Sequence, residues 1–179
     1  KLLARAKKLR LGDGLDPKTD VGPVVNAGQL ARIHRYVKIG QREGAKLLCG
    51  GRIRTDGELK KGHFYEPTIF DHVKPKMAIA QEEIFGPVMS ILRFKDVDEV
   101  VKRSNQTSYG LAAAVWTTDI AKAHALAHAL RAGTVWINCY AVSDAALPHG
   151  GYKQSGWGRD LGRAGLEQYT EVKAITVKM

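Results

Sequence analysis

The chain has 179 residues, of which 44% are hydrophobic and 26% charged, values that are ordinary for one globular domain with its own core. No apolar run approaches the length of a membrane span, and two cysteines are too few for a disulfide framework. The net charge of +10 suggests nucleic-acid binding, but the basic residues are scattered and no zinc finger, KH loop or RNP aromatic pair accompanies them. We therefore expect a solvated basic surface, with neither a nucleic acid nor a membrane as partner.

The first half of the chain predicts two helices followed by two strands. Residues 2–9 carry a helical stripe, and the absence of a long apolar segment among their basic residues argues against a signal peptide. We interpret this segment as the middle of an amphipathic helix, and we therefore expect the chain to be a piece of a longer protein. Asn26 suits the N-cap of a long helix that ends near Arg42, before Gly44. Residues 45–49 and 64–73 have strand composition. The inner face of the long helix is predicted to comprise Leu30, Ile33, Tyr36 or Val37, and Gly40.

From residue 88 onward, predicted strands and helices alternate. Strands are expected at residues 88–94, 111–116 and 134–138, and each is almost continuously apolar. One helix follows Asp96 to residue 105, and a second begins after Asp119 and stops before Gly133. This alternation is typical of βαβ units. The predicted fold class is therefore α/β, with a parallel sheet built from βαβ units and covered by helices on both faces.

The last part of the chain predicts a loop, a short helix and a terminal strand. Residues 139–151 have loop composition, and residues 161–169 suit a short helix. Apolar and polar residues then alternate over residues 172–178, as in a strand with one wet face and one buried face. We expect this strand to pair with another subunit or with an outlying ribbon.

Residues 81–88 place two adjacent carboxylates, an aromatic ring and a Gly-Pro break directly before a predicted strand. Two interpretations of this stretch stay open from the pattern alone. It is either a loop that presents polar and aromatic groups to a ligand, or a solvated turn with Phe85 in the core. Glu82 is expected to be a surface carboxylate.

The cysteines and histidines give no catalytic or metal-binding pattern. Cys49 and Cys139 lie in apolar surroundings without a nearby basic partner, so we interpret both as buried thiols in a reducing compartment. His124 and His128 have the helical spacing of metal ligands but lack a third ligand, so we predict no metal site.

Several segments, in their order along almost the whole chain, resemble the NAD(P)-dependent aldehyde dehydrogenases. These segments are Asp20-Val21-Gly22-Pro23, Glu43-Gly44-Ala45-Lys46, Glu66-Pro67-Thr68, Glu82-Glu83-Ile84-Phe85-Gly86-Pro87-Val88, Tyr109-Gly110-Leu111-Ala112-Ala113, Gly133-Thr134-Val135-Trp136-Ile137-Asn138 and Gly150-Gly151-Tyr152-Lys153-Gln154-Ser155-Gly156. The resemblance is greatest to the dimeric or tetrameric class that oxidises free aldehydes to carboxylic acids. It implies that residues 1–168 are part of the catalytic domain and that residues 169–179 are an oligomerisation strand.

The resemblance assigns four residues to cofactor binding, with NAD or NADP as the cofactor. It implies that the Glu83 carboxylate accepts hydrogen bonds from the nicotinamide ribose and that the Phe85 ring packs beside the nicotinamide. Gln29 and Arg32, one helical turn apart, match positions that reach the cofactor's ribose. Arg32 stands where a lysine is usual, and the two side chains differ in geometry. The alternative for this pair is two ordinary exposed helix residues.

The resemblance also identifies residues 140–149 as the substrate-entrance loop, which includes Val142, Ser143 and His149. Relatives often have aromatic residues where Ser143 and His149 stand, so an aldehyde with a polar group is expected. The alternative for His149 is a plain surface histidine.

The nucleophilic cysteine and the general base of this family are expected upstream of Lys1, because neither Cys49 nor Cys139 matches the nucleophile's context. In the family a thiolate attacks the aldehyde, and the resulting thiohemiacetal is oxidised to a thioester that water cleaves. We therefore expect this piece to be inactive alone, and the intact enzyme to be a cytoplasmic homodimer or homotetramer. The alternative function is a non-catalytic structural or oligomerisation module.

Overall fold

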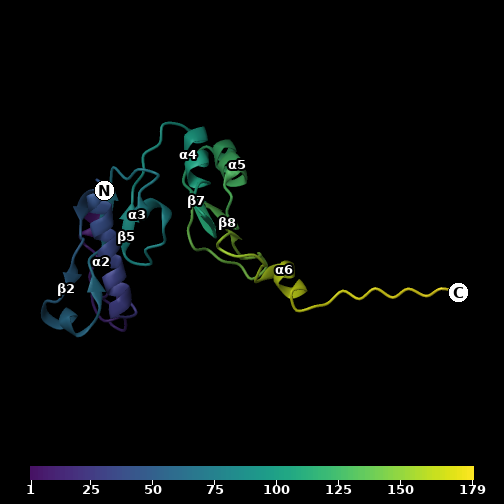
Figure 1. The fold of residues 1–179 in the computed structure, drawn as a ribbon, viewed down its shortest axis with the longest axis horizontal. Coiled ribbons are helices and arrows are strands. Elements are labelled where there is room, and N and C mark those ends of the chain that lie inside the picture. The colour runs from purple at the N-terminus through teal and green to yellow at the C-terminus, as the bar shows by residue number, and fades with distance from the viewer. The chain divides into compact units, whose positions relative to one another are not determined.

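The computed structural model describes residues 1–179, which divide into two compact units, Lys1–Arg93 and Phe94–Met179. Each unit is described by itself. Figure 1 shows the elements of both units along the chain, from the N-terminal helices to the extended C-terminus. None of the helices is long and apolar enough to cross a membrane.

The first unit is built around one long helix. Its helices are α1 (Leu2–Ala6), α2 (Ala27–Arg42) and α3 (Ala78–Gln81), with a short 3₁₀ helix, η1 (Gly57–Lys61). The Asn26 side chain accepts a hydrogen bond from the backbone N–H of Gln29, which confirms the predicted N-cap of α2. The chain leaves the helix through Gly44, whose φ of 91° lies in the left-handed region that glycine adopts without a steric cost.

Two small sheets complete the first unit. One has the order β1-β4-β5, formed by β1 (Lys46–Cys49), β4 (Thr68–Asp71) and β5 (Val88–Ser90). In it β1 pairs antiparallel with β4, and β4 pairs parallel with β5. The other sheet pairs β2 (Ile53–Arg54) antiparallel with β3 (Phe64–Tyr65). The predicted strand at residues 64–73 is divided at Pro67, which lacks the N–H that a continuous strand would use.

The hydrophobic core of the first unit lies between α2, α3 and the three-stranded sheet. Ile33 and Val37 of α2 are fully buried together with Phe70 of β4. Tyr36 and Gly40 are also buried, so the predicted inner face of α2 is correct except that Leu30 is half-buried. This core fixes α2 and the strands as one rigid body, from which the loop before β5 extends.

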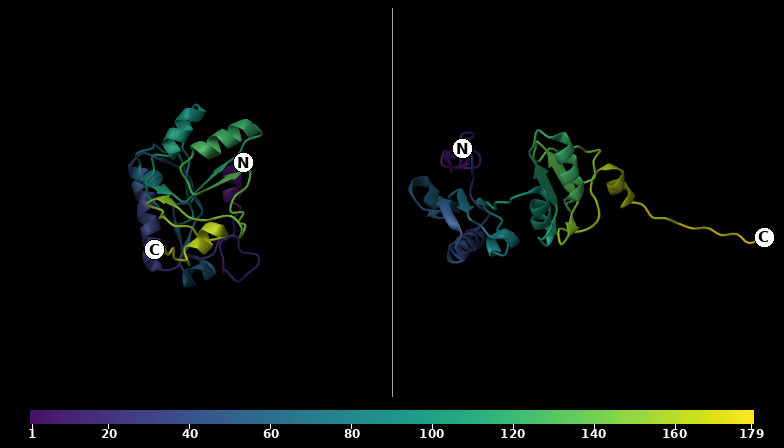
Figure 2. Two further views of the ribbon diagram at one scale, coloured as in Figure 1. Left: turned by 90° about the vertical axis from the view of Figure 1, so that its right-hand side faces the viewer. Right: turned by 90° about the horizontal axis from the view of Figure 1, so that it is seen from above.

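The second unit contains one βαβ element. Its helices are α4 (Val97–Ser104), α5 (Ile120–Ala129) and α6 (Gly162–Glu167). The parallel strands β7 (Ala112–Val115) and β8 (Thr134–Ile137) are joined through α5, which packs on both of them and contacts α4 (Figure 2). A separate antiparallel pair consists of β6 (Tyr109–Gly110) and β9 (Tyr152–Lys153). Asp96 and Asp119 cap α4 and α5 as predicted.

The structure confirms a mixed α/β fold, but its sheets are small and no extended parallel sheet covered by helices on both faces is present. Among the strands of the sheets, parallel pairing occurs in two separate places, β4 with β5 and β7 with β8, and every sheet has two or three strands. The apolar run near residue 46 becomes β1, which pairs antiparallel. Composition identifies a strand, but the direction and partner of each strand depend on contacts distant in sequence.

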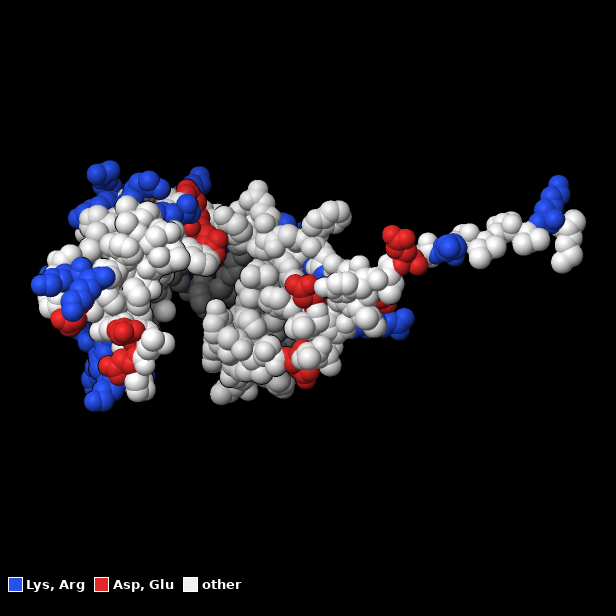
Figure 3. All heavy atoms as spheres, turned by 90° about the horizontal axis from the view of Figure 1, so that it is seen from below, with Lys and Arg blue, Asp and Glu red and all other residues white.

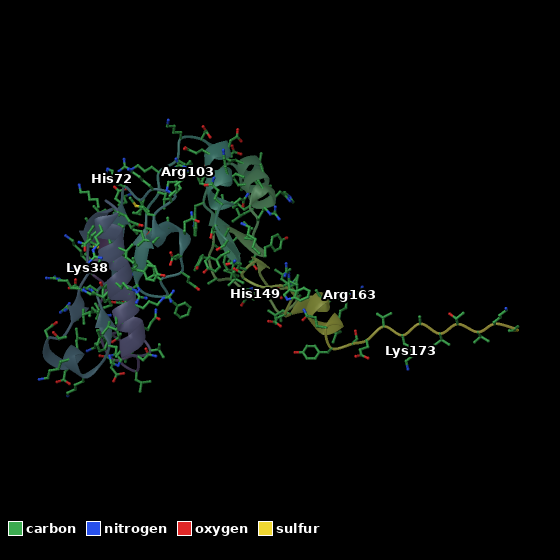
Figure 4. The ribbon with its side chains drawn as sticks, viewed as in Figure 1. Lys38, His72, Arg103, His149, Arg163 and Lys173 are labelled. Carbon is green, nitrogen blue, oxygen red and sulfur yellow. The ribbon has the colours of Figure 1, made fainter.

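Residues 170–179 form no helix or strand, and their side chains are exposed. Figure 1 shows them as an extended segment that follows α6, and Figure 4 marks Lys173 on it. The alternating segment at residues 172–178 therefore has no partner strand within this chain. Its pairing with another subunit stays a prediction.

Candidate functional site

The loop between α3 and β5, residues 82–87, is the candidate site of the first unit. It begins at Glu82, the C-cap of α3, whose backbone is already extended at φ −110° and ψ 149°. It ends where Val88 pairs with Thr68 in the parallel β4–β5 ladder, and the Thr68 N–H donates to the Pro87 carbonyl at 2.8 Å. Both ends of the loop are therefore attached to regular structure, which limits the movement of the residues between them.

Two side chains of α2 hold the backbone of this loop. The Gln29 amide nitrogen donates to the carbonyls of Ile84 and Phe85, at 2.9 and 2.8 Å. The Arg32 guanidinium donates to the Glu83 carbonyl at 2.8 Å. The structure thus brings together all four residues that the sequence assigned to the cofactor. Arg32 is exposed and Gln29 half-buried, and because the donors of both contact loop carbonyls, their contact with the cofactor stays a prediction.

A third side chain of α2, Tyr36, reaches the start of the loop. Its ring is 7% exposed, and its hydroxyl donates to the Glu82 carboxylate at 2.5 Å. This hydrogen bond to a carboxylate, with a smaller effect of burial, raises the pKa of Tyr36 above its ordinary value. The Arg32 guanidinium lies 5.2 Å from the centre of the same ring, within the range of a cation–π contact. Sequence reasoning missed the Tyr36–Glu82 contact, although positions 29, 32 and 36 share one helix face.

Glu83 and Phe85 direct their side chains away from the core. The Phe85 side chain is 74% exposed, so the interpretation that placed this ring in the core is wrong. Its φ is 55°, a left-handed conformation that costs a residue with a side chain about 1–2 kcal/mol. Glu83 is exposed and its carboxylate forms no hydrogen bond or ion pair, while its backbone carbonyl accepts from Arg32. The unpaired Glu83 carboxylate can accept hydroxyl donors, and the exposed Phe85 ring can cover a flat apolar group.

A cavity of about 430 Å³ in the second unit contains the predicted entrance-loop residues. Val142, Ser143 and His149 all line it, together with Trp136 of β8. The Trp136 indole N–H donates to the Val142 carbonyl at 2.8 Å, which fastens the loop to the strand. His149 exchanges two backbone hydrogen bonds with Asp160, at 2.7 and 2.8 Å, and Figure 4 marks its place before α6. The three predicted residues therefore meet at one concave surface.

The thiols and histidines form no further site. Cys49 and Cys139 are both free and half-buried, and the Cys49 thiol donates to the Pro67 carbonyl at 3.7 Å. Cys139 lines the cavity of the second unit. No group of three or more His, Cys, Asp or Glu side chains is placed to hold a metal ion. Figure 3 shows Lys and Arg in separate groups on the visible face, with Asp and Glu close to several of them.

Comparison with known proteins gives one family. The family model described as "Aldehyde dehydrogenase family" matches residues 1–175. The chain is 56% identical to the mitochondrial aldehyde dehydrogenase of Rattus norvegicus over 177 residues, which are 99% of this chain and 33% of that protein.

Solved structures show the same similarity. The NAD⁺ complex of an aldehyde dehydrogenase from Bacillus cereus has 46% identity and a TM-score of 0.93, covering 99% of this chain and 35% of that chain. The NAD⁺ complex of betaine aldehyde dehydrogenase from Staphylococcus aureus has 43% identity and a TM-score of 0.91, with 94% and 33% covered. The chain therefore spans about a third of the length of these relatives.

Proposed function

Because the chain belongs to the aldehyde dehydrogenase family, we propose that it is the C-terminal part of an enzyme that oxidises an aldehyde to a carboxylic acid with NAD or NADP. The observation that supports this most is the loop at residues 82–87. There an unpaired Glu83 carboxylate and an exposed Phe85 ring lie two residues apart, on a backbone held by α2.

The residues of this loop fit a nicotinamide cofactor. The Glu83 carboxylate has free acceptor positions for the two hydroxyls of a ribose, and such charge-assisted hydrogen bonds are stronger than neutral ones. The exposed Phe85 ring offers an apolar face to a flat aromatic group. When bound, NAD(P) supplies the hydride acceptor, and this chain's contribution is to hold it in position. Gln29 and Arg32 belong to the same site, and in this arrangement they support it through the loop carbonyls.

The cavity of the second unit is proposed as the entrance for the aldehyde. Its wall combines apolar side chains, such as Val142 and Trp136, with the polar groups of Ser143 and His149. This mixture suits an aldehyde that has a hydrogen-bonding group at some distance from the carbonyl. Two similar relatives from Bacillus subtilis and Brucella anthropi are named betaine aldehyde dehydrogenases, whose named substrate is polar.

The nucleophilic cysteine and the general base are proposed to lie upstream of Lys1 in the intact enzyme. The Cys49 thiol donates to a backbone carbonyl, and no basic side chain forms a hydrogen bond with the free Cys139 thiol. A nucleophilic thiol needs a group that stabilises its thiolate. The test is an NADH absorbance assay with a panel of aldehydes, applied to the 179-residue chain and to a full-length enzyme that contains it. Robust turnover by the chain alone would overturn the proposal.

Assembly through residues 169–179 gives a second candidate function, an oligomerisation module. The observation that favours it is the exposure of apolar side chains there, with Ile175 at 81% and Val177 at 77%. We propose a homodimer or homotetramer for the intact enzyme. Sedimentation of the full-length protein with and without residues 172–179 tests this, since an unchanged mass would count against assembly through the strand. The cytoplasmic location stays a prediction, and some similar relatives are named as mitochondrial.

A further inference from the structure

One face of α2 holds four consecutive loop residues. The side chains at positions 29, 32 and 36 follow the spacing that places residues on the same side of a helix. Gln29 and Arg32 bind the carbonyls of residues 83–85, and Tyr36 binds the carboxylate of Glu82. Every residue from 82 to 85 is therefore attached to α2, and the neighbouring side chains Ile33 and Val37 of this helix are buried in the hydrophobic core.

The Tyr36 contact differs from the other two because packing in the core holds its donor side chain in place. The Tyr36 ring is 7% exposed and belongs to the core cluster, so the position of its hydroxyl is fixed by packing. Gln29 and Arg32 reach the loop with long side chains that have several rotatable bonds. A hydrogen bond from a buried ring to a carboxylate is both charge-assisted and low in conformational entropy cost. Tyr36 is thus the most rigid of the three donors, and it acts on the loop through the exposed Glu82 side chain.

Glu82 transmits this rigidity to the residue after it. The Glu83 carboxylate has no partner within the chain, so its direction depends on the backbone on either side. The Tyr36–Glu82 contact fixes the backbone before Glu83, and the Gln29 contacts fix it after Glu83. Without the first contact, that peptide would keep the Arg32 hydrogen bond to the Glu83 carbonyl and the hydrogen bond from the Glu82 N–H to the Ala78 carbonyl, but no contact to the Glu82 side chain.

We propose that Tyr36 and Glu82 form a latch, defined as the hydrogen bond between the Tyr36 hydroxyl and the Glu82 carboxylate, that positions Glu83 and Phe85 for the cofactor. Both latch residues are positioning residues and act without touching the cofactor. The inference rests on the proposed function, because it requires that Glu83 and Phe85 meet NAD(P). It predicts that the latch lowers the cost of ordering the loop when the cofactor binds.

A double-mutant cycle in the full-length enzyme tests the latch. The variants are Tyr36→Phe, which removes only the hydroxyl, Glu82→Ala, and the two together. Calorimetric titration with NAD⁺ should give a Kd raised roughly three- to tenfold for each single variant. The double variant should be no weaker than the single ones, because both remove the same contact. Glu82→Gln, which keeps an acceptor oxygen, should recover most of the affinity.

Hydrogen exchange without cofactor gives a second readout. The amides of residues 82–86 should exchange faster in Tyr36→Phe than in the parent enzyme, while those of β4 should be unchanged. Tyr65→Phe is the matched control, because Tyr65 is also buried, at 1% exposed, and its hydroxyl contacts His34 Nδ1 at 3.0 Å instead of the loop. This control should leave the Kd for NAD⁺ and the exchange of residues 82–86 unchanged.

The outcomes separate failure of the latch from failure of the proposed function. If Glu83→Ala weakens NAD⁺ binding but Tyr36→Phe changes neither Kd nor loop exchange, the latch is wrong and the function stands. Additive effects of Tyr36→Phe and Glu82→Ala would also overturn the latch. If Glu83→Ala leaves NAD⁺ affinity unchanged, the proposed cofactor contact itself is wrong.

Discussion

Replacing Phe85 with glycine should separate stability from function at this loop. The φ of 55° at Phe85 costs about 1–2 kcal/mol, which glycine does not incur. The substitution also lowers the free energy of unfolding by about 0.4–1 kcal/mol, because glycine gives the unfolded chain more conformational freedom. Phe85 is 74% exposed, so removing the ring loses only about a quarter of the hydrophobic free energy of a fully buried side chain, or roughly 0.5 kcal/mol. These terms nearly cancel, and Phe85→Gly should change the free energy of unfolding by less than about 1 kcal/mol.

The same change should nevertheless lower catalysis, because the ring is proposed to hold the nicotinamide. Loss of positioning at a reacting group lowers the rate roughly tenfold to a hundredfold. The measurement is urea denaturation together with steady-state NADH formation, both on the full-length enzyme. The matched control is Phe70→Ala, since Phe70 is fully buried in the core of the same unit and its truncation should cost about 3–5 kcal/mol.

Two results would refute this reasoning. A loss of more than about 2 kcal/mol in Phe85→Gly, approaching that of Phe70→Ala, would mean that the ring packs as a core residue. Unchanged turnover in a stable Phe85→Gly enzyme would mean that the ring does not act on the cofactor. The two measurements are independent, so the stability argument and the functional one can fail separately.

Two further predictions concern the second unit. Gly133→Ala places a methyl group against the backbone oxygen of Gly150 and should lower the free energy of unfolding by about 1–3 kcal/mol, measured by thermal denaturation. The control is Gly14→Ala, whose added methyl group meets nothing within 4 Å and should leave stability nearly unchanged. The backbone N–H of Lys122 donates to the Asp119 carboxylate and holds the pKa of Asp119 below its ordinary value. The cap therefore contributes to stability at pH values well above the unfolded pKa, and its contribution is lost as the pH falls through the lower, folded value. The difference in urea midpoint between the parent and Asp119→Ala should therefore stay constant from pH 7 to about 4 and shrink at lower pH. A difference that already shrinks near pH 6 would contradict this assignment to Asp119.

Local chemistry was enough to predict where three of the helices begin. Asn26, Asp96 and Asp119 each accept a hydrogen bond from a backbone N–H in the first turn of the helix that follows. A cap depends on residues within three positions of one another, so the sequence contains the whole interaction. Most predicted strands also exist, although the structure shortens several of them, such as residues 88–94 to Val88–Ser90.

The pairing of the strands could not be predicted in the same way. Residues near 46 pair antiparallel with residues near 71, and no local pattern records this choice. The terminal segment shows the related problem of a missing partner. Its alternation predicts a strand, but a strand forms only against another backbone, and residues 172–178 have none in this chain.

The candidate site likewise has one part that local sequence patterns predict and another part that depends on contacts between segments distant in sequence. Glu83 and Phe85 were assigned from a short motif, because groups that meet a ligand must be of particular chemical types. Tyr36 was assigned to the core and Glu82 to the surface, and both assignments describe their exposure correctly. Their hydrogen bond spans 46 positions and joins the two environments, so neither local pattern contains it. A loop with an exposed ring at positive φ needs such support, because the cost of that conformation must be offset by contacts elsewhere. Residues that position a site are therefore found by asking what holds its strained backbone.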